Sequence, residues 1–249
     1  MIKNIVSGIK AYFGAFGLIS KLNLWKYFAI PMLISFITAV VIGVSAYGLS
    51  DNIGDFISKL WIWEWGKETF TTIGNIIGGI IIIILGLILY KHVIMALSAP
   101  FMSPVSEKIE THLLGSDKTY RITSFTEQLW RAIRINVRNL FMELLITIPL
   151  LILSFIPVIG ILFTILIFFI QAYYAGFSNM DYTLERHYKY NESLNFVKRN
   201  RGLAIGNGII FILFLLIPFI GVILVLPLSV TAASVKTIEA LQLESHYEK

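Results

Sequence analysis

The sequence predicts an all-α integral membrane protein with two long transmembrane helices, two re-entrant helical hairpins that penetrate part of the bilayer, and amphipathic interfacial helices. Of its 249 residues, 57% are hydrophobic and 14% are charged, whereas soluble domains average roughly 45 to 50% and 25%. Four stretches without charged residues span 24, 22, 37 and 34 positions, at 27–50, 69–90, 144–180 and 202–235. Each exceeds the roughly 18 residues that indicate a spanning helix, so we expect one membrane domain over residues 1–249.

The first expected element is an amphipathic helix over residues 2–19. Lys3 and Lys10 lie among apolar residues at helical spacing. The segment lacks the unbroken apolar core and small-residue cleavage site of a signal peptide, so we expect it to be retained. It either lies at the membrane interface or packs as a short helix under the bundle.

The two long helices are expected over residues 24–50 and 70–98, with an outer loop between them. Three tryptophans alternate in this loop, at Trp61, Trp63 and Trp65, as in an aromatic belt at a membrane interface. The second helix carries Gly74, Gly78, Gly79 and Gly86. Small residues suit close packing, either within the chain or between two copies. Pro100 and Pro104 predict a bent exit from this helix.

The basic residues predict how the chain crosses the membrane. All but three of the 20 Lys and Arg residues lie in four regions, at 1–26, 101–138, 178–202 and 236–249. The positive-inside rule assigns these regions, and therefore both termini, to the cytoplasm and places residues 51–68 outside. Each uncharged run after residue 140 must then enter the membrane from the cytoplasmic side and return to that same side.

Two related breaks explain how these runs return. Residues 154–162 read SFIPVIGIL and residues 215–223 read LLIPFIGVI. As single helices the runs of 37 and 34 residues would be about 55 and 51 Å long, too long for a core of about 30 Å. Two full crossings need at least about 40 residues, and only 13 and 16 uncharged residues precede Pro157 and Pro218. We therefore expect two shallow re-entrant hairpins; ordinary transmembrane hairpins in a thinned bilayer are the alternative.

The C-terminal part also predicts a parallel repeat. We expect residues 1–138 to hold the interfacial helix, the long helices and a connection, and residues 139–249 to hold two hairpin repeats. The first hairpin is preceded by a capping-box pair and three arginines, namely Ser124, Glu127, Arg131, Arg134 and Arg138. The second is preceded by Ser193, Lys198, Arg199 and Arg201. A basic interfacial helix is thus expected before each rising arm.

The sequence offers little support for catalysis. It contains no cysteine and its four histidines show no paired spacing, so neither thiol chemistry nor a zinc motif is indicated. A phosphate-binding loop is also missing, so ATP-driven transport is not expected. We expect no enzyme activity, metal or cofactor.

Two polar features fall within or beside the apolar runs. Lys91 and His92 are interpreted as a pair that ends a span and reaches toward the interface, in preference to a proton relay. Glu143 lies just inside an apolar run, where an acid is costly unless paired. Arg138 or Asn139 is its expected partner, in a structural ion pair at the membrane rim rather than a site that couples protons.

The best candidate for binding is SKLNLWKY, at residues 20–27. Asn23 is a favoured N-cap residue, so the amides of Leu24, Trp25 and Lys26 are expected to be free at a helix N-terminus. Such a terminus attracts anions, and Lys21 and Lys26 add positive charge. The predicted anion-binding residues are Lys21, Asn23, Leu24, Trp25 and Lys26; positive-inside lysines beside an ordinary helix cap are the alternative interpretation.

These residues resemble the sulfate permease CysZ family, which also includes the eukaryotic etoposide-induced proteins. The resemblance rests on FGLISKLNLWKYFAIP at 16–31, SAPF at 98–101 followed by Glu107 and Lys108, MDYTLER at 180–186, the twin I-P turns, and PLSVTAAS at 227–234. It implies two long spanning helices and two partly penetrating hairpins. It also implies ATP-independent sulfate uptake across the bacterial inner membrane for cysteine synthesis, by a homo-oligomer.

The resemblance also implies an anion site, and here the sequence departs from the family pattern. Family members commonly carry Gly-Leu-Arg, often with a second arginine, where this chain has Asn23, Leu24, Trp25 and Lys26. A lysine offers a point charge where arginine offers a planar fork, so the altered position bears on sulfate specificity.

Three functions follow as hypotheses. The first is transport of a small oxyanion, with sulfate expected, through an ATP-independent channel or permease. The second is a membrane-shaping or scaffolding protein without transport activity, because hairpins and amphipathic helices inserted from one face wedge one leaflet. The third, a lipid-modifying enzyme, has no catalytic constellation behind it. Expected partners are sulfate or a related oxyanion, the lipid bilayer and further copies of the chain, but not nucleic acid.

Overall fold

The described part of the chain is entirely helical, apart from turns and short connections. The computed structural model describes residues 1–58, 67–115, 121, 123–217 and 220–247. The helices are α1 (Ile2–Lys21), α2 (Trp25–Ser58), α3 (Lys67–Leu114), α4 (Phe125–Leu153), α5 (Gly160–Leu184), α6 (Tyr190–Arg199), α7 (Arg201–Leu215) and α8 (Ile220–Tyr247). Five of them contain stretches long and apolar enough to cross a membrane. The prediction of an all-α membrane protein is therefore confirmed.

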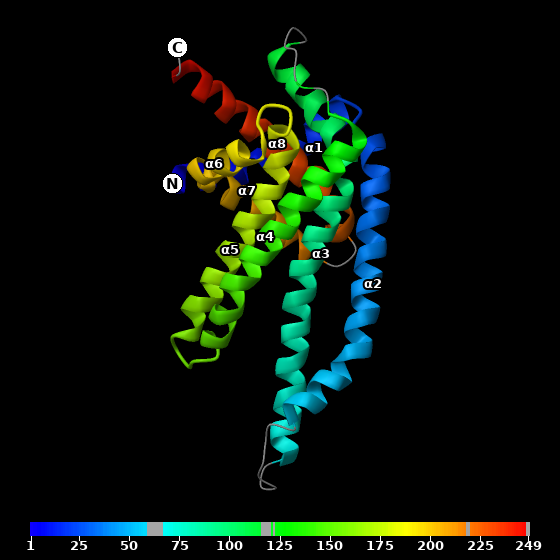
Figure 1. Cartoon of the computed structure of the whole chain (residues 1–249), viewed down its shortest axis with the longest axis vertical. Helices are drawn as coiled ribbons and strands as arrows, with labels where there is room; N and C mark the ends of the chain where they lie inside the picture. The colour runs from blue at the N-terminus through cyan, green and yellow to red at the C-terminus, as the bar shows by residue number, and fades with distance from the viewer. Residues whose placement is uncertain (59–66, 116–120, 122, 218–219, 248–249) are drawn as a thin grey trace.

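Helices α2 and α3 form a long antiparallel pair that extends beyond the rest of the bundle (Figure 1). Gly86 lies against α2, where a Cβ atom would approach Ile42 Cγ2 to 3.2 Å. This glycine therefore contributes to packing within the chain, as one of the two sequence interpretations proposed. Trp61, Trp63 and Trp65 lie outside the described residues, as do the side-chain surroundings of the other three glycines of the predicted face.

The second long helix is longer than predicted. It continues through Pro100 and Pro104 to Leu114, so the expected exit at about residue 98 is wrong. Each proline removes a backbone donor, so the helix loses the bonds that these amides would make. The Tyr182 hydroxyl of α5 donates to the Met95 carbonyl at 2.6 Å, more than one turn before Pro100. Contacts with α5 thus support this part of the helix.

The glycines of the two I-P-x-I-G segments make equivalent backbone hydrogen bonds. In the first, the Gly160 amide donates to the Ile156 carbonyl at 2.8 Å, and in the second, the Gly221 amide donates to the Ile217 carbonyl at 3.0 Å. Pro218 itself lies outside the described residues. Figure 1 shows that the α4–α5 turn stops short of the far end of α2 and α3, and that the meeting ends of α7 and α8 stop higher still.

The glycines of these turns are required by close approach. A Cβ atom on Gly160 would lie 2.0 Å from the Ser154 carbonyl oxygen, and one on Gly221 would lie 1.7 Å from that of Phe214. Neither glycine has positive φ; in the first turn Val158 does, at 70°. Glycine therefore permits the reversal by lacking a side chain rather than by an unusual conformation.

The two repeat units differ before their hairpins. Helix α4 is continuous from Phe125, so the separate interfacial helix predicted before the first arm is wrong. The second unit has the predicted break, because α6 ends at Arg199 and α7 begins at Arg201. Ser124 caps α4 as predicted, accepting from the Glu127 amide at 3.3 Å.

Helix α7 is held between α1 and α5 by small residues on opposite faces. Toward α5, a Cβ atom on Gly208 would lie 1.7 Å from the Ala172 carbonyl oxygen, and one on Gly176 would lie 1.8 Å from that of Ala204. Ala172–Gly176 and Ala204–Gly208 are therefore reciprocal small-xxx-small pairs. Toward α1, Gly206 approaches the Ile5 carbonyl in the same way. This stack fixes the position of the second hairpin.

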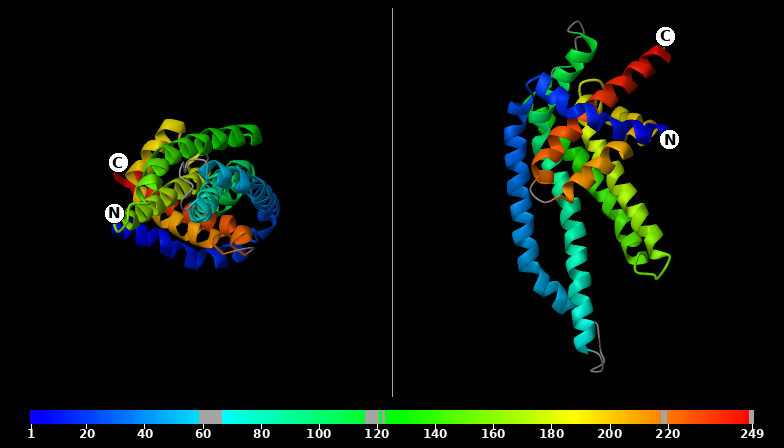
Figure 2. Two further views of the ribbon diagram at one scale, coloured as in Figure 1. Left: turned by 90° about the horizontal axis from the view of Figure 1, so that it is seen from below. Right: turned by 180° about the vertical axis from the view of Figure 1, so that it is seen from behind.

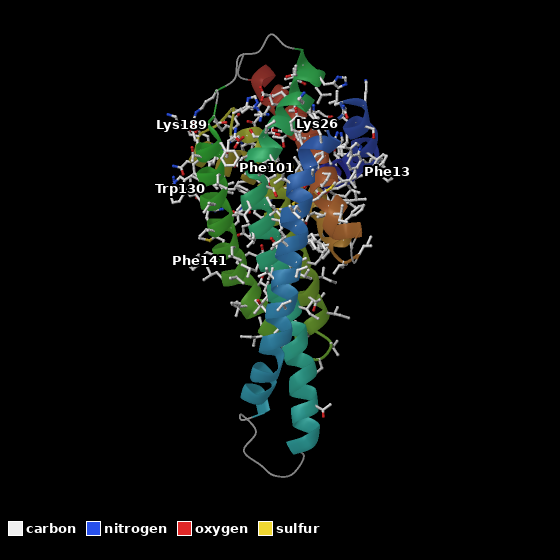
Figure 3. All side chains as sticks on the ribbon, turned by 90° about the vertical axis from the view of Figure 1, so that its right-hand side faces the viewer. Phe13, Lys26, Phe101, Trp130, Phe141 and Lys189 are labelled. Carbon is white, nitrogen blue, oxygen red and sulfur yellow. The ribbon has the colours of Figure 1, made fainter. Side chains whose placement is uncertain are left out.

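Helix α1 packs on the bundle, which was one of the two predicted arrangements; its position at a membrane interface stays a prediction. One face packs on α7 and α8, and the Tyr12 hydroxyl donates to the Asn207 carbonyl at 2.7 Å. Burial raises the pKa of this hydroxyl well above its usual value. The opposite face is apolar and open, with Phe13 87% exposed and pointing away from the bundle (Figure 3).

The regions rich in Lys and Arg gather at one end of the bundle. The start of α1, the end of α3, the start of α4, α6 and the end of α8 lie there, whereas the end of α2 and the start of α3 lie at the opposite end (Figures 1 and 2). Figure 3 places Lys26 and Lys189 toward the same end, on different sides of the bundle. This arrangement agrees with the relative sidedness predicted from charge.

Candidate functional site

The predicted anion-binding segment forms the turn between α1 and α2. The Asn23 amide donates to the Ser20 carbonyl at 3.2 Å, and the Leu24 amide donates to the Ile19 carbonyl at 2.9 Å. These two bonds, with Asn23 at φ 51°, form a Schellman motif that ends α1. Ile19 and Leu24 are both fully buried in the same hydrophobic cluster, which completes the motif.

Two details of the predicted site are therefore wrong. Asn23 ends α1 instead of capping α2, which begins at Trp25. The Leu24 amide is used by the Ile19 carbonyl and is not available to an anion. Asparagine serves here because it tolerates the left-handed conformation better than other residues with a side chain. The proposed role of the Trp25 and Lys26 amides stays a prediction.

The charged part of the segment joins a basic cluster from α3. Lys26 and Lys108 each place their ammonium near the ring of Tyr27, at 5.4 and 5.5 Å from its centroid. Lys21 Nζ lies 3.5 Å from His112 Nε2. We call Lys21, Lys26, Lys108 and His112 the basic cluster. Three positively charged lysines so close to a helix N-terminus create a positive potential suited to a dianion.

Lys108 and His112 were not among the residues predicted for this site. They lie more than 80 residues from the turn, and the last turns of α3 bring them beside it. The sequence feature that could have linked these two residues is their four-residue spacing, which puts both on one helical face. Trp25 contributes structurally, because its indole donates to Ser20 Oγ at 3.3 Å and packs edge-on against Phe16.

A second polar site lies inside the bundle, between α3, α4 and α5. Lys91 Nζ donates to Glu143 Oε1 at 2.5 Å and to the Gln171 carbonyl at 3.3 Å. His92 Nε2 lies 3.0 Å from the other carboxylate oxygen, Glu143 Oε2. The three side chains are 1%, 3% and 0% exposed. We call Lys91, His92 and Glu143 the buried triad.

The triad corrects two sequence interpretations. Lys91 and His92 do not end a span or reach to the interface, because α3 continues for more than twenty residues beyond them and both are buried. Glu143 does pair with a cation, but with Lys91 rather than the expected Arg138. Arg138 instead donates to Asn139 Oδ1 at 2.9 Å. The sequence feature that could have predicted this pair is the presence of two opposite charges, Lys91 and Glu143, each beside or within an apolar run.

A hydrogen-bonded chain connects the triad with Arg138. His92 Nδ1 lies 3.2 Å from Asn136 Oδ1, and Ser178 Oγ donates to the same oxygen at 2.9 Å. Asn139 Nδ2 donates to Ser178 Oγ at 3.4 Å, and Arg138 donates to Asn139. Arg138 is only partly buried. Polar groups therefore continue without a gap from the triad to a partly exposed cation.

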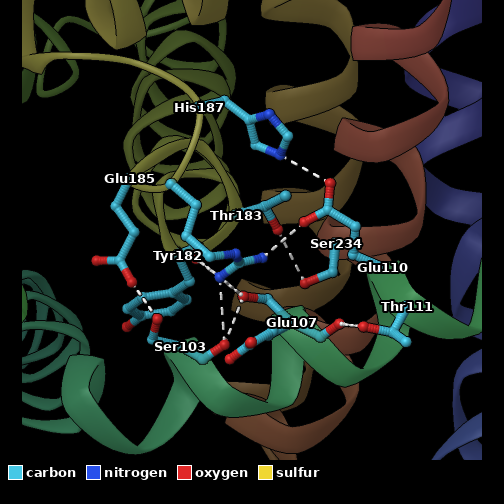
Figure 4. Close-up of polar contacts among 11 residues, drawn as sticks. Ser103, Glu107, Glu110, Thr111, Tyr182, Thr183, Glu185, His187 and Ser234 are labelled. Carbon is cyan, nitrogen blue, oxygen red and sulfur yellow. Dashed lines mark hydrogen bonds and ion pairs between the residues drawn. The ribbon is translucent and has the colours of Figure 1, made fainter. Parts of the chain in front are cut away.

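A third polar group joins α3 to the end of α5 (Figure 4). Arg186 Nη2 donates to Glu110 Oε2 at 3.0 Å, and Arg186 Nη1 donates to Ser106 Oγ at 2.8 Å. His187 Nε2 lies 2.7 Å from Glu110 Oε1, so the carboxylate of α3 is held from both sides by residues that follow the MDY segment. These contacts stabilise the end of the bundle that carries the basic cluster.

Glu185 lies beside this group, directly after the end of α5. It is 3% exposed and accepts from the Ser103 hydroxyl. Burial raises its pKa to about 7, against the opposing effects of the Ser103 hydrogen bond and of Arg186 and Arg131. Its charge therefore changes near neutral pH.

Arg131 of α4 binds the MDY segment of α5, α6 and the connection between α5 and α6. Its guanidinium makes a two-pronged contact with Asp181, at 3.1 Å from Oδ2 and 2.9 Å from Oδ1. It also donates to Ser193 Oγ at 2.7 Å and to the Tyr188 carbonyl at 2.7 Å. Both serines of the predicted repeat are thus used, but Ser193 binds an arginine and does not cap a helix.

The described residues contain no group of acids and histidines arranged to hold a metal ion. The polar groups are instead ion pairs and hydrogen bonds between helices, which are typical of an ion pathway or a structural network in a membrane bundle.

A family model described as sulfate transporter CysZ/etoposide-induced protein 2.4 matches the chain over residues 11–226. No curated protein matches the chain. The matched region contains the α1–α2 turn, the buried triad and most of both hairpins. The chain therefore belongs to the sulfate transporter CysZ/etoposide-induced protein 2.4 family.

Proposed function

We propose that this protein carries a small oxyanion, sulfate first among them, across a membrane without ATP hydrolysis. The observation that carries the proposal is the basic cluster, where Lys21, Lys26 and Lys108 gather beside the start of α2. The family match supports the same function. A dianion approaching from this side would meet several positive charges before reaching the apolar part of the bundle.

We further propose that both hairpins are re-entrant. The turn between α4 and α5 exposes apolar side chains, with Val158 92% exposed, and its carbonyls at Ile156 and Pro157 accept local backbone bonds. A turn that satisfies its backbone groups and exposes apolar side chains suits a lipid environment better than an aqueous loop. Such hairpins leave polar groups of α4 and α5 inside the bundle beside α3, where an anion pathway would lie.

The distribution of basic residues and the family match support a proposal for the location, orientation and partners of the protein. We place the protein in the bacterial inner membrane as a multi-pass protein, with both termini and the basic cluster in the cytoplasm. We expect a homo-oligomer that supplies sulfate for cysteine synthesis. Sulfate or a related oxyanion and the bilayer are its proposed partners; neither nucleic acid nor an enzymatic reaction belongs to the proposal.

Uptake of radiolabelled sulfate into proteoliposomes tests this function. Wild-type protein should admit sulfate faster than empty liposomes, and Lys26→Ala together with Lys108→Ala should slow it at least several-fold. Lys198→Ala is the matched control, because it removes an exposed lysine of α6 outside the basic cluster and should leave uptake unchanged. Wild-type uptake equal to that of empty liposomes, with the protein folded and correctly reconstituted, rejects the proposal.

The second candidate function is membrane shaping, and the open face of α1 favours it. Phe13 and Phe16 are 87% and 57% exposed, and Ile2 is 79% exposed, on a helix that packs against the bundle with its other face. An apolar face lying in one leaflet would wedge the lipids apart. Deformation of vesicles by protein that gives no sulfate flux would favour this function over transport.

A further inference from the structure

Arg138 and Arg201 occupy equivalent places in the two hairpin repeats. Arg138 lies in α4 and Arg201 begins α7. Each is the last basic residue before the apolar part of its arm, because the next Lys or Arg after Arg138 is Arg186 and the next after Arg201 is Lys236. In a membrane helix, basic residues give way to apolar ones where the headgroups meet the hydrocarbon. Both guanidinium groups are therefore expected at the depth of the lipid phosphates.

Helix α5 brings the two arginines to one place, because it packs against both α4 and α7. Tyr173 of α5 lies within electrostatic reach of the charges of both Arg138 and Arg201. Arg138 also lies over the ring of Phe177, with its Cζ atom 6.0 Å from the centroid. The Phe177 ring packs edge-on against Tyr173, with 6.2 Å between the centroids. Two cations and two aromatic rings thus gather where the two repeats meet.

Neither of these arginines has an acidic partner among the residues that the structure describes. Arg131, two turns before Arg138, is by contrast paired with Asp181. Arg138 is only partly exposed and donates one hydrogen bond, to Asn139 Oδ1 at 2.9 Å. A guanidinium has five N–H donors. A partly buried cation with unused donors and no counterion favours an anion that comes from outside the chain.

The surface of α4 beside Arg138 is apolar and faces outward. Trp130, Val137 and Phe141 are all exposed, and Figure 3 shows Trp130 and Phe141 pointing away from the bundle. Phe141 lies three residues beyond Arg138, so the two share one side of the helix. An acyl chain can follow this side of α4 into the bilayer from a phosphate held at Arg138. A soluble anion has no use for such a surface.

We propose that Arg138, Arg201 and Tyr173 bind the phosphate of an anionic phospholipid from the leaflet at the basic end of the bundle. Guanidinium groups bind phosphate oxygens in two-pronged contacts, and the tyrosine hydroxyl can donate a further hydrogen bond. One headgroup then links the arms of both hairpins, α4 and α7. The inference goes beyond transport, because it concerns a lipid that holds the repeats together and does not depend on which anion is carried.

The charge of the site selects among lipids. Phosphatidylcholine carries its own cation next to the phosphate, and two arginines repel that cation. Phosphatidylglycerol has the same phosphodiester without a cation, so it suits the arginines better. The expected ligand is therefore a phospholipid with a net negative charge, and phosphatidylglycerol is the probe.

Native mass spectrometry of the full chain tests the proposal. The protein is released from micelles that contain phosphatidylglycerol and phosphatidylcholine in equal amounts, and each bound lipid is identified by its mass. The wild type should retain one phosphatidylglycerol per chain in preference to phosphatidylcholine. Arg138→Gln and Arg201→Gln should each weaken the retention of phosphatidylglycerol about fivefold, the effect of one basic residue at an anionic membrane surface. Lys198→Gln is the matched control, because it removes an exposed lysine three residues before Arg201 and should leave retention unchanged.

Three results would overturn the proposal. Equal retention of the two lipids would mean that an acyl chain alone suffices. An equal loss in Lys198→Gln would indicate general attraction to a basic surface. Displacement of the lipid by sodium sulfate or glycerol phosphate at the same concentration would make this a site for soluble oxyanions. Arg201 is exposed at the start of its helix, so Arg201→Gln keeps the test informative if Arg138→Gln fails to fold.

Discussion

Removing the acid of the buried triad should destabilise the protein strongly, and removing its cation as well should reverse most of the loss. Glu143 is fully buried and is 2.5 Å from Lys91 Nζ. In Glu143→Leu the Lys91 ammonium keeps only the Gln171 carbonyl, at 3.3 Å. Leaving one charge of a buried pair without its partner costs about 3–5 kcal/mol. The double variant Glu143→Leu/Lys91→Met replaces the pair by apolar groups and should lie much closer to wild type.

The single variant Lys91→Met should be milder than Glu143→Leu. Its Glu143 still has His92 Nε2 at 3.0 Å as a polar partner. The free energy of unfolding of all four proteins can be measured in mixed micelles from the fluorescence of the five tryptophans. The same cycle on Lys236 and Glu239, a surface pair at 2.7 Å, should give less than about 1 kcal/mol. Additive effects at the buried pair would refute the reasoning.

Three further predictions concern packing, the α1–α2 turn and pH. Gly208→Ala should destabilise by about 1–3 kcal/mol, because its Cβ would meet the Ala172 carbonyl, whereas Gly17→Ala, with open space around it, should not. Asn23→Val should cost about 1–2 kcal/mol because of the left-handed conformation, while Asn23→Gly should be tolerated; thermal unfolding measures both pairs. The pKa of Glu185 is raised from 4.5 to about 7, so the free energy of unfolding should fall as pH rises through this range, by at most about 3 kcal/mol. Glu185→Gln should remove that slope, and an unchanged slope would contradict the assignment.

Much of the architecture could be predicted from local features of the sequence. Run lengths and the two I-P-x-I-G breaks locate the long helices and both turns, because crossing a bilayer limits helix length. Helix ends were harder to predict. Pro100 and Pro104 are strong local stop signals, but α3 continues through them, where Ala99, Met102 and Val105 are buried in the core of the bundle. Tertiary contacts thus overrode the local preference.

The candidate sites were only partly predictable for a related reason. Asparagine is favoured both at a helix N-cap and at the left-handed position after a helix, and only the backbone conformation of Asn23 decides between these roles. Glu143 was recognised as an acid in need of a partner, but its partners lie about 50 residues away. Helical spacing identifies neighbours on one helix and does not reveal which helix packs against it.

The account depends most directly on hairpins that end inside the bilayer, and labelling of single cysteines tests this. The chain contains no cysteine, so Val158→Cys at the α4–α5 turn and Thr72→Cys in the part of α3 nearest the outer loop can each be labelled without background. A membrane-impermeant maleimide added outside intact cells should modify Thr72→Cys and leave Val158→Cys unmodified. Modification of Val158→Cys as fast as Thr72→Cys would place the turn at the outer surface and contradict the account.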